Sequence, residues 1–294
     1  MPSETRTCAL TGANGFVGRE LKGFLERAGW KVVPWVRRPS ASSGGVEFTL
    51  GQAVNVRDFA GVEALVHCAY DFSLVKWKDI ERVNVGGTSE LLRAATEGGV
   101  PRLVLISSLS AFPGCRALYG RAKLEMEALT KAAGGYSIRP GLVYGDIPGG
   151  VFGKLVRQVR SSKIVPVISG GKQTQYLLHA EDLGAVVKVF LEGAGSVGKP
   201  ISAAHEQPWE MLDILRQIAL ALGRKVHFLP VPWQVVWMGL RGLEIARLPT
   251  NFRSDSLTSM VYQDPQPEFN ARELGIRCRP FALSERMIRD ESKV

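Results

Sequence analysis

Thr11-Gly-Ala-Asn-Gly-Phe-Val-Gly18 lies between an apolar run at residues 7–11 and an amphipathic stretch at residues 16–28. These two flanks predict a strand and a helix, so the glycine spacing G-x-x-G-x-x-G falls in the turn that joins them. Glycine permits a tight turn and lets the backbone approach a pyrophosphate closely. The helix start adds free N–H groups for the phosphates. We expect dinucleotide contacts from Gly12, Asn14, Gly15, Phe16, Val17 and Gly18.

Alternating strands and helices continue outward from this turn. Apolar runs predict strands at residues 7–11, 31–36, 46–50, 64–68, 102–106 and 136–139. Helical patterns cover residues 16–28, 84–97 and 119–133. This alternation predicts the α/β class, with a Rossmann-type doubly wound parallel sheet.

The pattern changes after Pro140, where glycine-rich turns, short strands, Trp and Pro become frequent. We therefore expect a dinucleotide-binding domain at residues 1–150 and a smaller C-terminal substrate-binding lobe, mainly residues 151–294. Residues 174–200 are expected to pack back on the first domain, because residues 181–190 form an apolar helical pattern.

Composition narrows the classes of partner. Lysines and arginines number 37 and acidic residues 28, so the formal charge is 37 − 28 = +9, but the cations are spread along the chain. This favours a solvated surface with phosphate contacts over nucleic-acid binding. The four cysteines and four histidines show no metal-ligand spacing and follow no secretory signal. We expect reduced thiols, no metal and a cytoplasmic location.

No run of eighteen uncharged apolar residues occurs, so no membrane partner is expected. The nearest segment is residues 231–240, where Trp233 and Trp237 lie one helical turn apart. Core packing, a dimer contact or pocket lining would each explain this apolar stripe. Association with a membrane surface is the less favoured alternative, suggested by Arg241, Arg247 and Arg253.

Arg37 and Arg38 follow the second expected strand, where an acidic residue would bind the ribose 2′-hydroxyl of NAD. Guanidinium groups instead suit a 2′-phosphate through bidentate pairing. The sequence therefore favours NADP over NAD, with NAD as the alternative if both side chains only face solvent.

Tyr119 and Lys123 share one face of an expected helix, because positions i and i+4 are neighbours. A nearby ammonium would favour the phenolate and lower the phenol pKa, which suits proton exchange with a substrate oxygen. Ser108 follows the fifth strand, at the edge where ligands bind in such sheets. Asn84 opens a helix and is interpreted as its N-cap.

Together these motifs resemble an extended short-chain dehydrogenase/reductase of the NAD-dependent epimerase/dehydratase family. The matching segments are residues 11–18, 65–69, 84–88, 106–108, 119–123, 139–145, 179–182 and 274–280. The resemblance implies hydride transfer, with catalytic roles for Ser108, Tyr119 and Lys123 and support of the lysine by Asn84. It also implies that Tyr119, Lys123 and Ala69 contact the cofactor. A small-molecule substrate and, by analogy alone, a homodimer are expected.

Several positions depart from the family pattern. Leu109 and Ser110 stand where dehydratases tend to have Asp-Glu, so water elimination is disfavoured. Leu142 and Gln175 replace an Asn and an Arg that many nucleotide-sugar enzymes have. These departures weaken the nucleotide-sugar interpretation without excluding it.

Three hypotheses of function follow. The first is an oxidoreductase or epimerase acting at a carbinol or ketone carbon, with a nucleotide-activated sugar as substrate. The second is an NADP-dependent reductase or dehydrogenase of a non-nucleotide ketone, aldehyde or hydroxysteroid-like alcohol. The third is a non-catalytic cofactor-sensing protein, which the presence of both Tyr119 and Lys123 disfavours.

Overall fold

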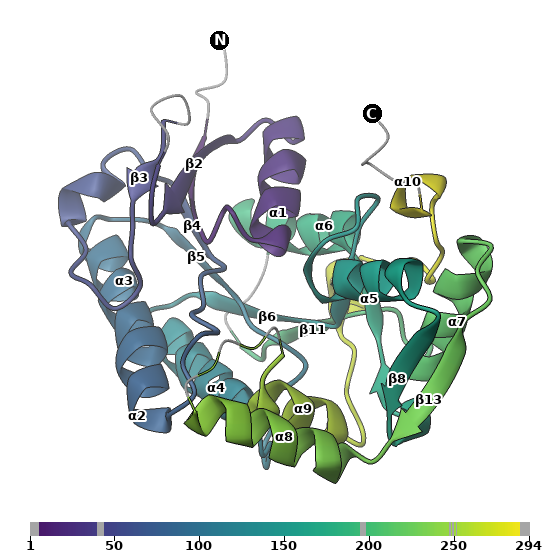
Figure 1. Cartoon of the computed structure of the whole chain (residues 1–294). Helices are drawn as coiled ribbons and strands as arrows, with labels where there is room; N and C mark the ends of the chain where they lie inside the picture. Colours follow the sequence, from purple (N-terminus) through teal and green to yellow (C-terminus); the bar gives the residue numbers. More distant parts are fainter. Residues whose placement is uncertain are drawn as a thin grey trace.

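A seven-stranded sheet forms the centre of the computed structural model, which describes residues 6–39, 44–194, 198–246, 248, 250 and 252–288. Every pairing in this sheet is parallel, and the strand order is β11-β6-β5-β4-β1-β2-β3 (Figure 1). The strands are β1 Thr7–Thr11, β2 Lys31–Val36, β3 Val46–Glu47, β4 Ala64–His67, β5 Arg102–Ile106, β6 Tyr136–Pro140 and β11 Ile201–Ala203. The expected Rossmann-type α/β sheet is confirmed.

Helices cover both faces of the sheet, as parallel strands require. One face packs against α1 (Phe16–Arg27) and α6 (Ala180–Leu191), which share one apolar cluster with β1 and β5. The other face packs against α3 (Gly86–Glu97) and α4 (Leu118–Ala132). All four residues of β4 are buried, so this strand reads as a continuous apolar run ending at His67.

A separate apolar cluster lies beyond the sheet, built from α5, α7, β8 and their neighbours. Its elements are β7 Leu142–Tyr144, α5 Gly150–Ser161, β8 Ile164–Ile168, η3 Ser169–Gly171, β9 Thr174–Gln175, β10 Leu177–His179, β12 Trp209–Glu210, α7 Met211–Ala221, β13 His227–Val231 and α10 Glu285–Ile288. Helix α9 (Ser254–Val261) packs against α4, and α8 (Trp233–Ile245) packs against α9. We propose that this cluster, with α8 and α9, forms the substrate-binding lobe.

Two local features differ from the expectation. Strand β3 ends at Glu47 rather than at residue 50, and it pairs only with Trp35 and Val36. Pro34 is tolerated in β2 because the short strand β3 makes no ladder hydrogen bond with the Pro34 position.

The remaining short helices are η1 Val56–Phe59, α2 Trp77–Ile80, η2 Glu81–Val85 and η4 Ala271–Leu274.

The helix expected to begin at Asn84 begins earlier. Helix α2 starts at Trp77 and runs through the π-helical turn η2 into α3. Asn84 therefore lies inside a continuous helical run and is fully buried. The N-cap interpretation is wrong, because the preceding residues are already helical. Single π-turns of this kind are frequent at functional sites.

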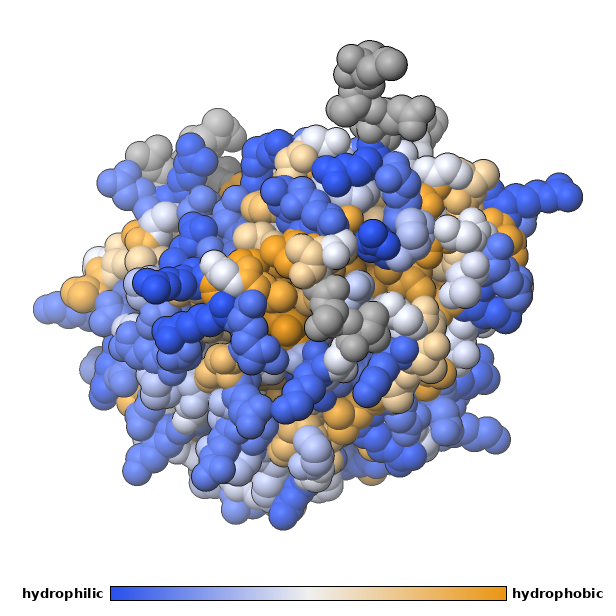
Figure 2. Space-filling model, turned by 180° about the vertical axis from the view of Figure 1, so that it is seen from behind, coloured by the Kyte–Doolittle hydropathy of each residue, from blue (hydrophilic) through white to orange (hydrophobic). Residues whose placement is uncertain are grey.

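Hydrophilic residues dominate the face opposite to that of Figure 1, with hydrophobic residues reaching the surface near its centre (Figure 2). None of the helices in the described part of the chain has the length and apolar character needed to cross a membrane.

Candidate active site

The glycine turn after β1 is shaped by two positions that exclude a side chain. Gly12 has a φ of +68°, and a Cβ there would lie 2.9 Å from the backbone nitrogen of Ala69. A Cβ at Gly18 would lie 2.3 Å from the carbonyl oxygen of Gly12. Any larger residue would force the turn away from β4 or away from α1. The expected close approach of backbone to ligand is thus available in this structure.

The start of α1 presents N–H groups without a side-chain cap. Gly15 is the N-cap residue, and no side-chain hydrogen bond satisfies the first turn that begins at Phe16 and Val17. Asn14 and Gly15 are exposed, while Phe16 and Val17 are half-buried against the core. Uncapped N–H groups and the positive end of the helix dipole form an anion-binding site. This cradle fits a dinucleotide pyrophosphate.

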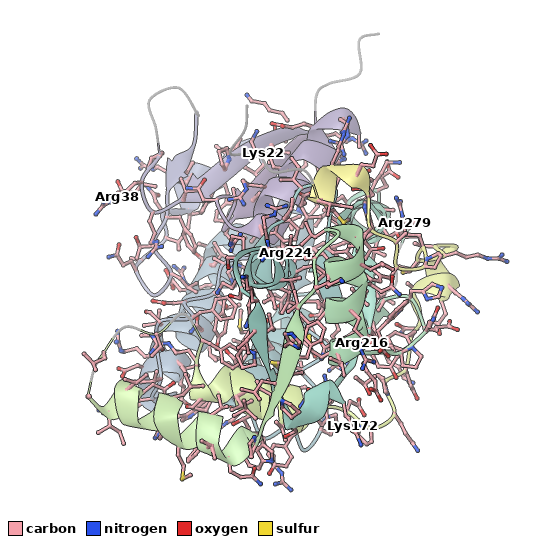
Figure 3. The ribbon with its side chains drawn as sticks, turned by 45° about the vertical axis from the view of Figure 1, so that its right-hand side comes forward. Lys22, Arg38, Lys172, Arg216, Arg224 and Arg279 are labelled. Atoms are coloured by element: carbon pink, nitrogen blue, oxygen red, sulfur yellow. The ribbon has the colours of Figure 1, made fainter. Side chains whose placement is uncertain are left out.

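Arg37 and Arg38 follow β2 at the edge of the sheet where the glycine turn lies, and both are exposed. Figure 3 shows Arg38 extending outward from the body of the protein. Both guanidinium groups are therefore accessible to a phosphate dianion, and neither is committed to the core.

A buried chain of hydrogen bonds connects the glycine turn to the helix that contains Asn84. Thr88 Oγ1 donates to the Asn84 carbonyl at 2.7 Å and lies 3.0 Å from His67 Nε2. His67 Nε2 must therefore be the donor in that contact, and Nδ1 accepts from Thr11 Oγ1 at 2.7 Å. Burial, with a smaller effect of Lys123, lowers the pKa of His67 to about 3, so the ring is neutral. This chain fixes the strand ends beside the expected cofactor site.

Tyr119 and Lys123 lie on one face of α4, as their spacing requires. Lys123 Nζ is 5.9 Å from the centre of the Tyr119 ring and donates a hydrogen bond to the Ile106 carbonyl at 2.8 Å. The side chain of Lys123 is almost completely buried. The two groups therefore share a position at the carboxyl end of β5, next to Ser108.

Burial decides the protonation of both groups. Desolvation raises the pKa of Tyr119 to about 12, and a hydrogen bond with Ser108 acts in the opposite direction. Desolvation also lowers the pKa of Lys123 to about 8. The expected lowering of the phenol pKa by the ammonium is wrong for this structure, because the loss of hydration on burial is the largest effect on the phenol and raises its pKa. At neutral pH Tyr119 holds its proton and can donate it.

Asn84 holds a neighbouring loop through two hydrogen bonds. Its Oδ1 accepts from the Asp71 backbone N–H at 2.7 Å, and its Nδ2 donates to the Asp71 carbonyl at 3.3 Å. These two bonds fix the segment that carries Tyr70 and Phe72. The support of Lys123 implied by the resemblance is not among the hydrogen bonds that Asn84 makes here.

Tyr70 and Phe72 place aromatic rings beside the Tyr119 phenol. The Tyr70 ring meets Tyr119 edge-on with centroids 5.0 Å apart, and the Phe72 ring lies 5.5 Å from it. Phe72 is 61% exposed, so one end of this aromatic cluster reaches solvent. Neither residue was singled out from the sequence, although their position directly after Ala69 at the end of β4 was a usable signal.

Helix α9 supplies a second group that sequence analysis missed. Asp255 accepts hydrogen bonds from the backbone N–H groups of Leu118 and Tyr119, at 2.7 and 2.9 Å. Ser259 Oγ donates to Ser110 Oγ at 2.8 Å, beside the same helix start. An acidic side chain at a helix N-terminus satisfies free donors and complements the dipole. No local pattern could reveal this pair, because the partners lie far apart in the sequence.

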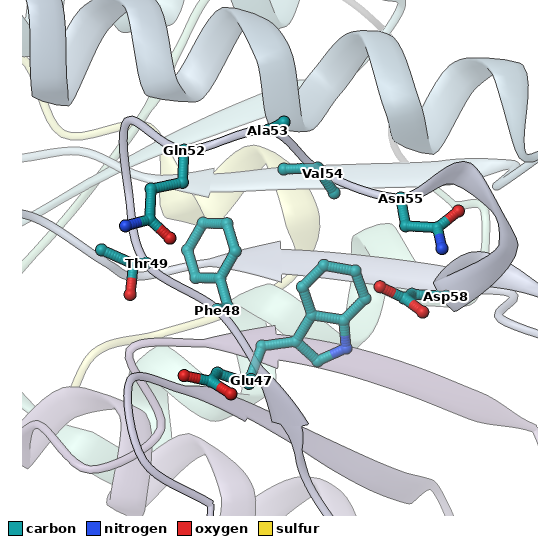
Figure 4. Close-up of a pocket in the computed structure, with 9 residues that line it drawn as sticks. Glu47, Phe48, Thr49, Gln52, Ala53, Val54, Asn55 and Asp58 are labelled. Atoms are coloured by element: carbon teal, nitrogen blue, oxygen red, sulfur yellow. The ribbon is translucent and has the colours of Figure 1, made fainter.

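A pocket of about 230 Å³ lies elsewhere, at the β3 edge of the sheet (Figure 4). Its lining residues are Trp35, Glu47, Phe48, Thr49, Gln52, Ala53, Val54, Asn55 and Asp58. None of these is among the site residues expected from the sequence.

The sequence model of the NAD dependent epimerase/dehydratase family matches residues 8–203. The chain belongs to this family. The match spans the glycine turn, the π-turn and the Tyr119–Lys123 helix, so the chain is an enzyme of the extended short-chain dehydrogenase/reductase type.

Individual relatives act on chemically different substrates. A ceramide reductase of Caulobacter vibrioides is 28% identical, covering 76% of this chain and 73% of that protein. A UDP-glucose 4-epimerase of Vibrio cholerae is 26% identical, covering 77% of this chain and 79% of that protein. The solved structure of MoeE5 in complex with UDP-glucose and NAD has a TM-score of 0.65 at 20% identity, covering 87% of this chain and 97% of that one. This last likeness shows the shared fold.

Proposed function

We propose that this enzyme is a net reductase or dehydrogenase of an apolar, non-nucleotide carbonyl or alcohol, with Tyr119 as the proton donor in the reductive direction. The nicotinamide of the family's cofactor supplies the hydride when it is bound. The observation that carries the substrate class is the aromatic cluster around the phenol, in which Phe72 is 61% exposed. Such a wall provides apolar contact area for a hydrocarbon skeleton.

The protonation of the site supports the reductive direction. Because burial raises the pKa of Tyr119 to about 12, the phenol enters the reaction protonated and can pass its proton to a substrate oxygen. Lys123 donates to the Ile106 carbonyl, which holds its ammonium behind the phenol. Ser108 acts on the pKa of Tyr119 through a hydrogen bond, which supports a role for its hydroxyl as a second donor to the substrate oxygen.

The cofactor proposal is NADP in preference to NAD. Arg37 and Arg38 are exposed at the end of β2 and available to a 2′-phosphate. For the pyrophosphate, the uncapped start of α1 and the side-chain-free positions Gly12 and Gly18 form the cradle.

A second candidate is a nucleotide-activated sugar, favoured by the relation to the UDP-glucose 4-epimerase. The positions that weaken it are Leu142, which lies in β7, and Gln175, whose side-chain amide donates to the Thr174 carbonyl at 2.8 Å. Neither offers a cation to a diphosphate.

The test compares oxidation of reduced cofactor with long-chain or polycyclic ketones and with UDP- and dTDP-sugars. We expect turnover of the apolar ketones and a KM for them that is raised about tenfold in Phe72→Ser. The control is Leu220→Ser, which replaces another exposed apolar residue away from the site and should leave the KM unchanged. Turnover of a UDP-sugar, together with a higher melting temperature in UDP, would instead establish the second candidate.

A further inference from the structure

Helix α8 exposes an apolar face where a surface helix of a globular protein would be polar. Its outward-facing residues include Val235, Met238, Leu243 and Ile245, of which Met238 is 60% and Ile245 75% exposed. Glu244, the carboxylate of this helix, is buried. A helix that buries its carboxylate while exposing this many hydrophobic residues has an outer face suited to a partner.

The inner face of α8 is held by specific polar contacts, so the helix is a fixed part of the fold. Glu244 accepts hydrogen bonds from the Ser254 backbone N–H at 2.9 Å and from Ser254 Oγ at 2.7 Å. Arg241 Nη1 lies 3.3 Å from the same carboxylate. The Trp233 ring meets Tyr262 edge-on at 5.9 Å. These contacts anchor α8 to α9. The opposite face of α8 points away from the protein, along its lower side in Figure 1.

The apolar surface continues toward the active site. Arg253 Nη2 donates to the Ser73 carbonyl at 3.1 Å, which ties the segment after α8 to the loop that carries Phe72. Leu248 in that segment is half exposed, as is Phe72 next to Tyr119. The outer face of α8 and the aromatic wall of the site are thus joined through one pair of loops.

The charges around α8 identify its partner. Two arginines lie in or just after α8: Arg241, whose side chain is 47% exposed although it also contacts Glu244, and the partly exposed Arg253, whereas the carboxylate Glu244 is buried and accepts hydrogen bonds from Ser254. Cations beside an apolar helix face match an anionic lipid surface. A second copy of the chain would bring like charges together. A face of 13 residues, about 20 Å long and 10 Å wide, also offers only about 200 Å², against about 800 Å² per partner in a stable dimer.

We propose that α8 is a peripheral membrane-docking helix, whose outer face enters the headgroup region of an anionic phospholipid bilayer. This docking sets the Phe72 end of the active site against the lipid surface. The earlier expectation of no membrane partner rested on the lack of a spanning segment, and a helix that lies on the surface is a different arrangement. The proposal does not depend on the substrate, because vesicle binding is measured without turnover.

The test is flotation of the full-length protein with vesicles of phosphatidylcholine alone or mixed with phosphatidylglycerol. We expect partitioning onto the mixed vesicles that weakens as salt rises. Met238→Glu/Ile245→Glu, and Ile245→Glu alone, should reduce the partition coefficient at least tenfold, and Arg241→Gln about fivefold. Leu220→Glu is the matched control, because Leu220 in α7 is 76% exposed, and it should bind like the wild type. Melting temperatures show that each variant is folded.

Three outcomes would overturn the proposal. The wild-type protein could fail to float with either vesicle. Leu220→Glu could lose as much binding as Ile245→Glu, which would remove any special role for α8. Light scattering could instead show a dimer that Ile245→Glu dissociates, with no vesicle binding, and a second copy of the chain would then be the partner.

Discussion

The carboxylate of Asp255 accepts a hydrogen bond from the backbone N–H of Tyr119 at 2.9 Å, so α9 fixes the first turn of α4. The same side chain holds the N–H of Leu118 at 2.7 Å. The position of the phenol therefore depends on a residue from the C-terminal part of the chain.

Replacement of Asp255 by Ala should reduce both stability and turnover. Loss of a helix cap costs about 1 kcal/mol of unfolding free energy. A small displacement of Tyr119 should lower kcat about tenfold or more, since catalysis depends on sub-ångström placement. Denaturant unfolding and steady-state kinetics measure the two effects. Asp213→Ala is the control, because Asp213 occupies the first turn of α7 and should affect neither by much. Equal kinetic effects in both variants would contradict the role of Asp255.

Lys123 should make stability depend on pH in the cofactor-free enzyme. Its folded-state pKa of about 8 lies below the ordinary value of 10.5, so the unfolded chain binds more protons between these two values. Stability should therefore rise with pH from about 8 to 10.5, and the buried ammonium costs at most about 3 kcal/mol below pH 8. Lys123→Met should be more stable than the wild type at pH 7, although inactive. This difference should shrink by pH 10 in denaturant titrations; a constant difference would argue against the lowered pKa.

The two arginines after β2 should set cofactor preference. Arg37→Ser/Arg38→Ser removes both guanidinium groups available to a 2′-phosphate and should weaken NADPH binding at least tenfold, with little change for NADH. Fluorescence titration of reduced cofactor measures both affinities. Arg224→Ser, which alters an exposed arginine elsewhere, should leave the preference unchanged. A wild-type enzyme that already prefers NADH would refute the assignment.

Asn84 should act on substrate affinity through the loop that it holds. Asn84→Ala leaves two backbone groups of Asp71 without their partners and should destabilise the protein by about 1–3 kcal/mol. Because Tyr70 and Phe72 would loosen, KM should rise more than kcat falls. Asn84→Asp keeps the acceptor for the Asp71 N–H and should be milder. If kcat falls strongly while KM stays constant, Asn84 would instead belong with Tyr119 and Lys123.

The spacing of residues within a single turn or a single helix was sufficient to predict some parts of this fold and site. Gly12 and Gly18 were identifiable because a strand and a helix flank them, and Tyr119 and Lys123 because four residues separate them on one helix. The parallel sheet followed from the regular alternation of strands and helices.

The remaining parts depend on contacts between distant segments. Asp255 reaches α4 across more than a hundred residues, and His67 links Thr11 to Thr88 only after the strands have paired. Asn84 was misplaced because the helix before it starts at Trp77 without a side-chain cap to mark it. The direction of the Tyr119 pKa shift required the burial of the ring, which sequence does not provide.

The central claim is that Tyr119 supplies the proton, and Tyr119→Phe tests it most directly. The substitution keeps the ring and removes the hydroxyl, so kcat should fall about 10²- to 10⁴-fold while the dissociation constant of the reduced cofactor stays within about twofold. Tyr262→Phe, at the end of α9, should retain full turnover. Wild-type turnover in Tyr119→Phe would contradict the assigned chemistry.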